Sequence, residues 1–121
     1  MSSLNPGAGP GGEGVALEAI ADGAVIELEA LVDGEPESLI VHRDGAAVRA
    51  WRNICPHAGR RLDWAPGQFL RAKDGSLVCA VHGATFALAD GRCTAGPCRG
   101  QALAPVAVEV REGRVHVTGA A

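Results

Sequence analysis

Two short clusters of cysteine and histidine constrain this chain more than any other feature of its sequence. Cys55 and His57 stand in "ICPHAG", and Cys79 and His82 stand in "VCAVHGATF". The chain has only four cysteines and four histidines in 121 residues, so the two clusters take half of each. Each cluster also contains a glycine, which suits a tight loop. Thiolate and imidazole groups gathered in this way are typical of a metal centre held between two loops.

Three interpretations of these four side chains stay open from the residues alone. A [2Fe–2S] cluster can have one iron held by two thiolates and the other by two imidazoles, so each loop would give one ligand to each iron. A structural zinc accepts the same ligands, but it usually pairs cysteines about two to four residues apart and then histidines about three to five apart. Here each pair is mixed. The third interpretation is buried cysteines beside incidental histidines, and the repetition of the pair argues against chance.

Alternating apolar residues predict β-strands on both sides of the two clusters. A period of two is the pattern of a half-buried strand. The predicted strands cover residues 26–30, 39–41, 48–51, 106–110 and 115–117. Turn residues at 43–45 and 112–113 predict that two pairs of these strands form hairpins. No helical period is sustained, and the segment 15–21 is too short to assign, so the fold class expected is all-β.

The middle of the chain, roughly residues 53–100, differs from both ends. It holds all four cysteines and is rich in glycine. We expect a single domain over residues 15–121, in which both ends build an antiparallel β base and the middle forms a loop-rich insertion that carries the ligands. Residues 1–14, "MSSLNPGAGPGGEG", are expected to form a flexible tail, because glycine and proline favour disorder over packing.

Charge and hydropathy exclude two classes of partner. The net charge is −3 and there is no run of lysine or arginine, so nucleic-acid binding has little electrostatic support. No apolar stretch approaches the roughly 20 residues that a membrane span needs. The N-terminus lacks the positive and apolar regions of a secretory signal. We therefore expect a cytoplasmic protein, whose cysteines are thiols or metal ligands because that compartment is reducing.

The pattern C-x-H followed by C-x-x-H resembles the signature of the Rieske family. "NICPHAGRRL" resembles the first cluster loop, and "LVCAVHGATFALADGRCTAGP" resembles the second loop, its hairpin and the Gly-Pro segment that covers the cluster. The similarity covers about residues 15–118. It implies a Rieske-like fold, with an antiparallel β base domain and an inserted cluster-binding subdomain, and one [2Fe–2S] cluster. By ligand position, Cys55 and Cys79 would hold one iron, and His57 and His82 the other.

The residues near the ligands point to a low reduction potential. High-potential members of the family carry an extra cysteine in each loop, and the two form a disulfide. This chain has Arg60 after the first loop, and Ala80 and Val81 between the ligands of the second. Those members also direct a serine and a tyrosine hydroxyl at the cluster and its sulfur ligand, where this chain has Ala84 and Phe86. Fewer donors to sulfur stabilise the reduced cluster less, so a ferredoxin-type centre is expected.

The function implied by the resemblance is one-electron transfer, with no catalysis by the chain alone. As a ferredoxin it would carry electrons from a flavin-dependent reductase to a terminal oxygenase, such as a ring-hydroxylating dioxygenase. One alternative is a small Rieske subunit or accessory domain of a larger reductase, similar to the small subunit of assimilatory nitrite reductase. A zinc-stabilised interaction module without a redox role is the third possibility.

Five further residues carry expectations of their own. Cys93 and Cys98, in "GRCTAGPC", are expected to be small packed residues, in preference to a short disulfide or additional ligands. Trp64 and Phe69 are expected to pack beneath the cluster loops, in preference to marking a docking surface. His42 lies within a strand pattern and is expected to face solvent, without a role.

Overall fold

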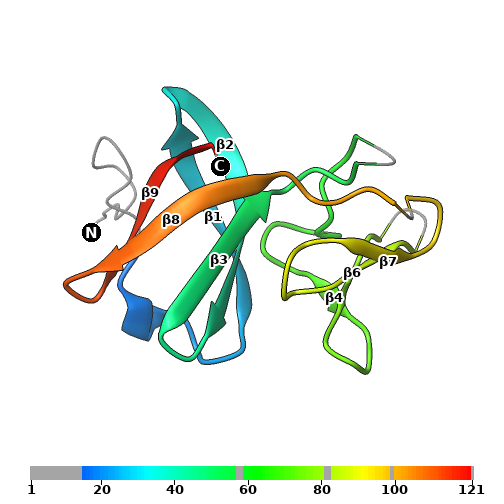
Figure 1. The fold of residues 1–121 in the computed structure, drawn as a ribbon, viewed down its shortest axis with the longest axis horizontal. Coiled ribbons are helices and arrows are strands. Elements are labelled where there is room, and N and C mark those ends of the chain that lie inside the picture. Colours follow the sequence, from blue (N-terminus) through cyan, green and yellow to red (C-terminus); the bar gives the residue numbers. More distant parts are fainter. Residues whose placement is uncertain (1–14, 57–58, 81–82, 99, 121) are drawn as a thin grey trace.

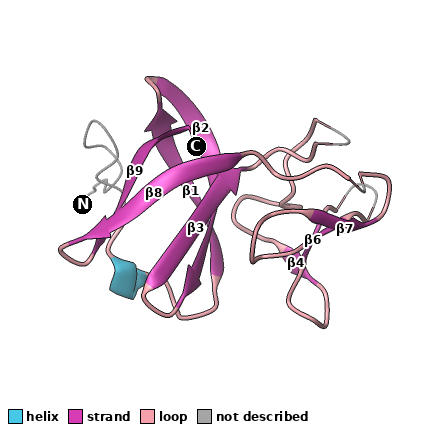
Figure 2. Cartoon of the chain, viewed as in Figure 1, coloured by secondary structure: helices cyan, strands magenta, loops and turns pink. Residues whose placement is uncertain are grey.

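A five-stranded antiparallel sheet, called here the base sheet, organises the chain. The computed structural model describes residues 15–56, 59–80, 83–98 and 100–120, so the expected tail at 1–14 lies outside the described residues. In spatial order the strands are β1 (Val25–Val32), β2 (Glu35–Asp44), β3 (Ala47–Arg52), β8 (Pro105–Arg111) and β9 (Arg114–Ala120). The five predicted strands all fall within them. The undecided segment contains a 3₁₀ helix, η2 (Leu17–Ala19), as Figure 2 shows. In these ranges no helix is long and apolar enough to cross a bilayer.

Both predicted hairpins are confirmed, and their turns explain the choice of residues. β2 and β3 pair from Leu39↔Arg52 to Asp44↔Ala47, and Gly45 turns the chain with φ of 64°. β8 and β9 are joined by Glu112 and Gly113, whose φ angles of 52° and 74° are both left-handed. A two-residue hairpin turn of this kind matches the right-handed twist of its strands, and glycine adopts it without strain.

A second, smaller sheet forms the middle of the chain. Its four antiparallel strands are β4 (Leu70–Arg71), β5 (Leu77–Val78), β6 (Thr85–Phe86) and β7 (Cys93–Ala95). The chain leaves the base sheet at the end of β3 and returns at the start of β8, and these two ends pair through Trp51↔Pro105 (Figure 1). The small sheet and its loops are therefore an insertion between two neighbouring strands, as the sequence predicted.

Two apolar clusters fill the space on the two faces of the base sheet. One lies within the base-sheet half and includes Leu39 and Val41 of β2. The other joins the base sheet to the inserted part, and it contains Ile40 and Trp51 together with Phe86. β2 is thus buried on both faces, since successive side chains of a strand point to opposite sides.

The double burial of β2 makes the expectation for His42 wrong. His42 is only 8% exposed, and its Nδ1 atom has no hydrogen-bond partner. It follows Leu39, Ile40 and Val41 in a run of four buried residues. Burial, and then the charges of Arg71 and Arg49, lower the pKa of His42, so the neutral imidazole is favoured.

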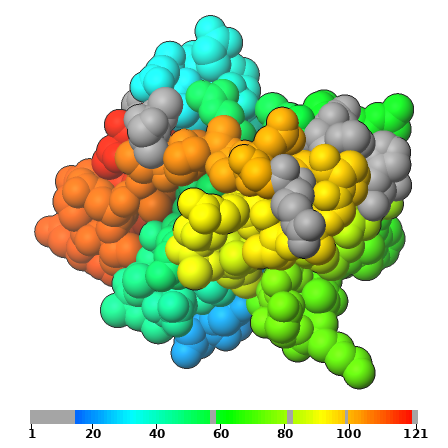
Figure 3. All heavy atoms as spheres, turned by 45° about the vertical axis from the view of Figure 1, so that its right-hand side comes forward, coloured from blue at the N-terminus to red at the C-terminus, as the bar shows by residue number. Residues whose placement is uncertain are grey.

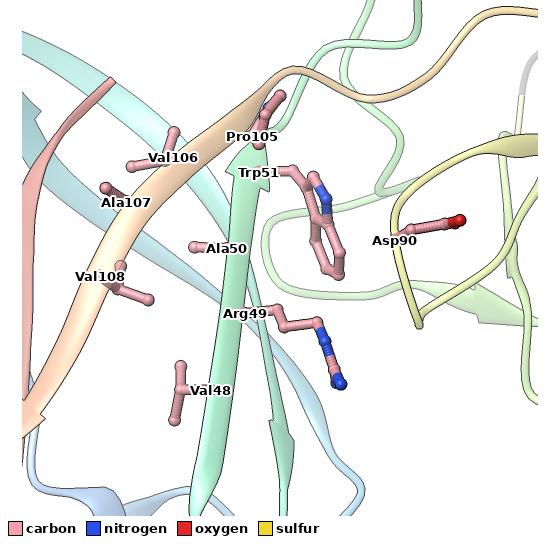
Figure 4. A pocket seen from close by; sticks show the side chains of 9 residues that line it. All are labelled: Val48, Arg49, Ala50, Trp51, Asp90, Pro105, Val106, Ala107 and Val108. Carbon is pink, nitrogen blue, oxygen red and sulfur yellow. The ribbon is translucent and has the colours of Figure 1, made fainter. Parts of the chain in front are cut away.

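Trp51 connects the two halves of the molecule. Its indole lies against Gly91, where an added Cβ would meet the Trp51 ring, 2.9 Å from Cδ1. Leu103 N–H donates to Gly91 O over 2.9 Å, which fixes the hairpin against the chain that returns to the base sheet. In the space-filling view the hairpin segment around residue 90 (yellow) lies against the chain that returns to the base sheet beyond residue 100 (orange) (Figure 3). Beside this joint an open pocket of about 340 Å³ has Arg49 and Trp51 directed toward Asp90 (Figure 4).

Candidate functional site

Cys55 begins a tight loop, residues 55–60, called here the first loop. The Cys55 N–H donates to Arg60 O over 2.6 Å, and the Gly59 N–H donates back to Cys55 O over 2.8 Å. Gly59 has a φ of 67°, a left-handed conformation that favours glycine. The two bonds close the loop and aim the Cys55 side chain into the protein, where it is 1% exposed.

Cys79 begins a second loop, residues 79–84, with the same backbone bonds. The Cys79 N–H donates to Ala84 O over 2.7 Å, and the Gly83 N–H donates to Cys79 O over 2.9 Å. Gly83 has a φ of 75°, close to that of its counterpart in the first loop. Cys79 is also 1% exposed and lies in the same apolar cluster as Cys55. Two matching loops therefore present two buried thiols to one region of the core.

The backbone of these loops is not by itself specific for a metal. Residues 87–92 form a third loop with the same two bonds, from Ala87 N–H to Arg92 O at 2.9 Å and from Gly91 N–H to Ala87 O at 2.7 Å. This loop has no cysteine or histidine. The chemistry thus depends on the side chains that the first and second loops carry.

The described part of the site fits the sulfur half of a [2Fe–2S] centre. Cys55 and Cys79 are not disulfide-bonded, and their burial excludes water from thiolate ligands. His57 and His82 lie outside the described residues. In the ranges that the structure does describe, no three side chains of ligand type gather as a metal site. The assignment of the four ligands therefore stays a prediction.

The described residues at the returning end of the second loop are apolar. Ala84 and Phe86 are both 0% exposed and share the apolar cluster with the two cysteines. Gly96 lies directly on the loop, because a Cβ added there would approach the Cα of Ala84 to 2.8 Å. Gly96 also has a φ of 98°. This position therefore requires glycine on both counts, and the segment around it covers Ala84.

Cys93 and Cys98 are buried in the same cluster, which confirms the expectation that they are packed residues. The Cys93 thiol donates to Ala95 O over 3.3 Å. Burial, then a hydrogen bond to Cys93 and nearby sulfur charge, raise the pKa of Cys98 to about 12. Cys98 is therefore a neutral thiol at physiological pH.

The expectation of core packing is wrong for Trp64 and confirmed for Phe69. Trp64 is 61% exposed, whereas Phe69 is partly buried against the apolar cluster. Trp64 lies in a turn, where its backbone N–H donates to Gln68 O over 3.0 Å, and its side chain is exposed to solvent. Ile54, next to Cys55, is also exposed, at 46%. Two large apolar side chains thus flank the first loop in the sequence and reach solvent.

Sequence reasoning missed two residues that belong to the site. Asn53 and Asp63 are 1% and 8% exposed, and they hydrogen-bond around the first loop. Their only signal in the sequence is position: they flank the loop in "RNICPH" and "RRLD". Polar residues so close to a loop are common at protein surfaces, and nothing in the pattern marks these two as buried.

Comparison with known proteins agrees with this geometry. A family model described as the Rieske [2Fe-2S] domain matches residues 19–116. The ferredoxin of carbazole 1,9a-dioxygenase from Nocardioides aromaticivorans IC177 has a TM-score of 0.69 at 25% identity, over 92% of this chain and 99% of that one. The fold recurs in a complex of reduced oxygenase and oxidized ferredoxin of carbazole 1,9a-dioxygenase, with a TM-score of 0.68 at 24% identity over 90% and 94% of the two chains.

A longer relative matches over part of this chain. The oxidoreductase NdmD of Pseudomonas putida is 39% identical over 75 residues, which is 61% of this chain. The matched stretch is only 12% of the length of that oxidoreductase. The family match, by contrast, covers most of the present chain. The chain belongs to the Rieske [2Fe-2S] domain family.

Proposed function

We propose that this protein is a one-electron carrier of the ferredoxin type. The observation that carries the proposal is the pair of matching loops that bury Cys55 and Cys79 in one apolar cluster of a chain that matches the Rieske family model. The other two ligands in the proposal are His57 and His82, one from each loop. A bound [2Fe–2S] cluster would supply reversible one-electron chemistry. The chain's own part is to hold the ligands, exclude water and present the cluster edge to partners.

The surroundings of the loops support a low potential within the range of such centres, roughly −150 to +300 mV. Ala84 and Phe86 are fully buried and have no hydroxyl group to donate to sulfur. Hydrogen bonds to sulfur stabilise the more negative, reduced state, so their loss makes reduction harder. A low-potential carrier can pass electrons onward to an oxygenase.

The partners we propose are a flavin-dependent reductase as donor and a terminal oxygenase as acceptor. Support comes from the ferredoxin of carbazole 1,9a-dioxygenase, which matches this chain over nearly its whole length. The exposed side chains of Ile54 and Trp64 beside the first loop suit brief contact with another protein. Weak redox encounters use small interfaces of this kind.

The test begins with metal content, because the four cysteines offer a matched control. Anaerobically purified or reconstituted protein should contain iron and acid-labile sulfide, and should show an EPR signal after reduction. Cys55→Ser and Cys79→Ser should lose the cluster, whereas Cys93→Ser should keep it. Wild-type protein without iron and sulfide after reconstitution would contradict the proposal. Colourless protein that contains zinc would identify the zinc-stabilised module instead.

Electron transfer is tested separately from metal binding. Reduced protein mixed anaerobically with an oxidised Rieske oxygenase should lose its reduced-state spectrum as the oxygenase gains its own. A loaded protein that reduces no oxygenase, and that purifies with a large reductase, would favour the alternative of a reductase subunit or accessory domain. The match to a small part of the oxidoreductase NdmD is the observation that supports this alternative.

We also propose the domain organisation and the compartment. Residues 15–121 would form one Rieske domain whose cluster-binding part is about 53–100, in line with the range of the family match. The compartment proposed is the cytoplasm. Its support is that the proposed thiolate ligands and the buried Cys93 and Cys98 suit a compartment that keeps thiols reduced.

A further inference from the structure

The first and second loops have the same backbone bonds but different supports. The second loop is the turn of a hairpin, and β5 and β6 pair on either side of it through Val78↔Thr85 and Leu77↔Phe86. The first loop has no such ladder, because Leu62, on its returning side, belongs to no strand. Something other than strand pairing must therefore keep the first loop closed.

The side chain of Asn53 takes the place of the missing ladder. Its Oδ1 accepts a hydrogen bond from the Leu62 N–H over 2.9 Å, which ties the two ends of the first loop together. Its Nδ2 donates to Ser38 Oγ over 3.2 Å, and the amide lies close enough to the Asp63 carboxylate to help lower the pKa of that group. The Asn53 N–H donates to Ser38 O over 2.9 Å, which anchors the residue to β2. Only an amide offers both an acceptor and two donors in this position.

Asp63 holds the returning side of the same loop. Its carboxylate accepts from Arg61 Nε over 2.9 Å and from one Arg61 terminal nitrogen over 2.7 Å. It also accepts from the Gly67 N–H over 3.1 Å. Burial opposes ionisation of Asp63, but these bonds and the nearby Asn53 amide outweigh it and lower the pKa of Asp63. The buried carboxylate is therefore ionised and fully engaged.

Arg61 links this pair back to the base sheet. Its terminal nitrogen lies 3.0 Å from Glu27 Oε2, and Ser38 Oγ donates to the same oxygen over 2.7 Å. The connected side chains, called here the polar ring, are Glu27, Ser38, Asn53, Arg61 and Asp63. Buried polar groups are costly unless they are satisfied. Among the described residues, the ring contains two of the three buried polar side chains.

We infer that Asn53 and Asp63 are positioning residues, which hold the first loop in its ligand-bearing shape through the polar ring. The inference rests on the proposed function in one respect, namely that the loop carries Cys55 and His57 as ligands. Neither residue touches the metal in this proposal. They act on the ligands through the backbone of the loop, as outer-shell partners do in other metal sites.

The test uses an exchange of the two side chains. Asn53→Asp adds a second carboxylate near that of Asp63 and removes the donor to Ser38 Oγ, and it should speed iron loss to a chelator roughly 10- to 100-fold. The double variant N53D/D63N restores one amide facing one carboxylate, so it should recover at least half of that effect on a logarithmic scale. Asp74→Asn is the matched control, because Asp74 also accepts a backbone N–H, from Ser76 at 2.9 Å, in an exposed turn.

A second readout separates positioning from general stability. The EPR g values and the midpoint potential of reduced protein should change in N53D, return toward wild type in N53D/D63N and stay unchanged in D74N. In metal-free protein the Leu62 amide should exchange with solvent faster in Asn53→Ala than in wild type. Iron loss and spectra in N53D equal to those of D74N, or no recovery in the double variant, would overturn the inference. Wild-type protein that binds no iron would instead overturn the proposed function.

Discussion

Gly91 carries the sharpest stability prediction, because an added methyl group there has nowhere to go. A Cβ on Gly91 would contact the Trp51 indole, with Cδ1 at 2.9 Å and Cε2 at 3.0 Å. Trp51 is 3% exposed, so moving its ring would disturb the side chains packed against it. The backbone of Gly91 is also held, by bonds to Ala87 O at 2.7 Å and from the Leu103 N–H at 2.9 Å. Gly91→Ala must therefore displace either the indole or the hairpin.

The expected magnitude has two parts that a control can separate. Gly91 has a φ of 77°, and placing alanine in this region costs about 1–2 kcal/mol. Overpacking against Trp51 adds about 1–3 kcal/mol. Gly113→Ala is the control, since Gly113 has a φ of 74° with no atom near a built Cβ. It should show the backbone part alone.

Thermal unfolding of the cluster-containing protein at one fixed scan rate measures the difference in stability between the Gly91→Ala and Gly113→Ala variants. Each kcal/mol should lower the apparent melting temperature by about 4–8 °C in a domain of this size, so G91A should melt well below G113A. Trp51→Leu removes the clash, and adding G91A to it should cost only the backbone part. Equal losses in G91A and G113A, or the full G91A loss in the Trp51→Leu background, would refute the reasoning.

Three further outcomes are expected. Ala84→Ser or Phe86→Tyr should raise the midpoint potential in a redox titration, because each adds a hydroxyl donor near sulfur; an unchanged or lower midpoint would contradict the account of low potential. Cys93 and Cys98 are 3% and 1% exposed, so they should resist alkylation at about pH 8 in folded protein and react after unfolding; rapid labelling of native protein would show that they are not packed. The lowered pKa of His42 means that the unfolded chain binds the proton more readily. Its contribution to stability is thus present above about pH 6.5 and lost as the pH falls through the lowered value, and His42→Phe should remove this dependence from pH-resolved denaturation curves.

The base sheet could be predicted from the sequence in part because some of its strands, among them β1 and β8, are only partly buried. β1 and β8 alternate in the way that a strand with one wet face requires, and the glycine turns that join neighbours are local signals. The burial of β2 could not be predicted from such alternation. Four consecutive residues of β2, the last of them His42, are buried. The reason is that the inserted part covers the face of the sheet that would otherwise be exposed to solvent.

The inserted part was less predictable, for a physical reason. β4 to β7 are only two or three residues long, too short to show a period of two. The spacing of cysteine and histidine nevertheless predicted the first and second loops, because the residue types that can bind a metal are visible in the sequence. The polar ring could not be found in this way. Asn53 and Asp63 act through hydrogen bonds that depend on the path of the folded chain, and the same residues on a surface would look identical in sequence.

The positions of η2 and β9 have a consequence for proteins in which this domain is joined to other domains. η2 and β9 lie in the base-sheet half of the molecule, and the inserted part with β4, β6 and β7 lies in the other half (Figure 1). Another polypeptide fused at either of these points would therefore leave the loop end uncovered. If electron transfer takes place through the inserted part, as proposed, the same surface would be available in a separate protein and in a multidomain protein.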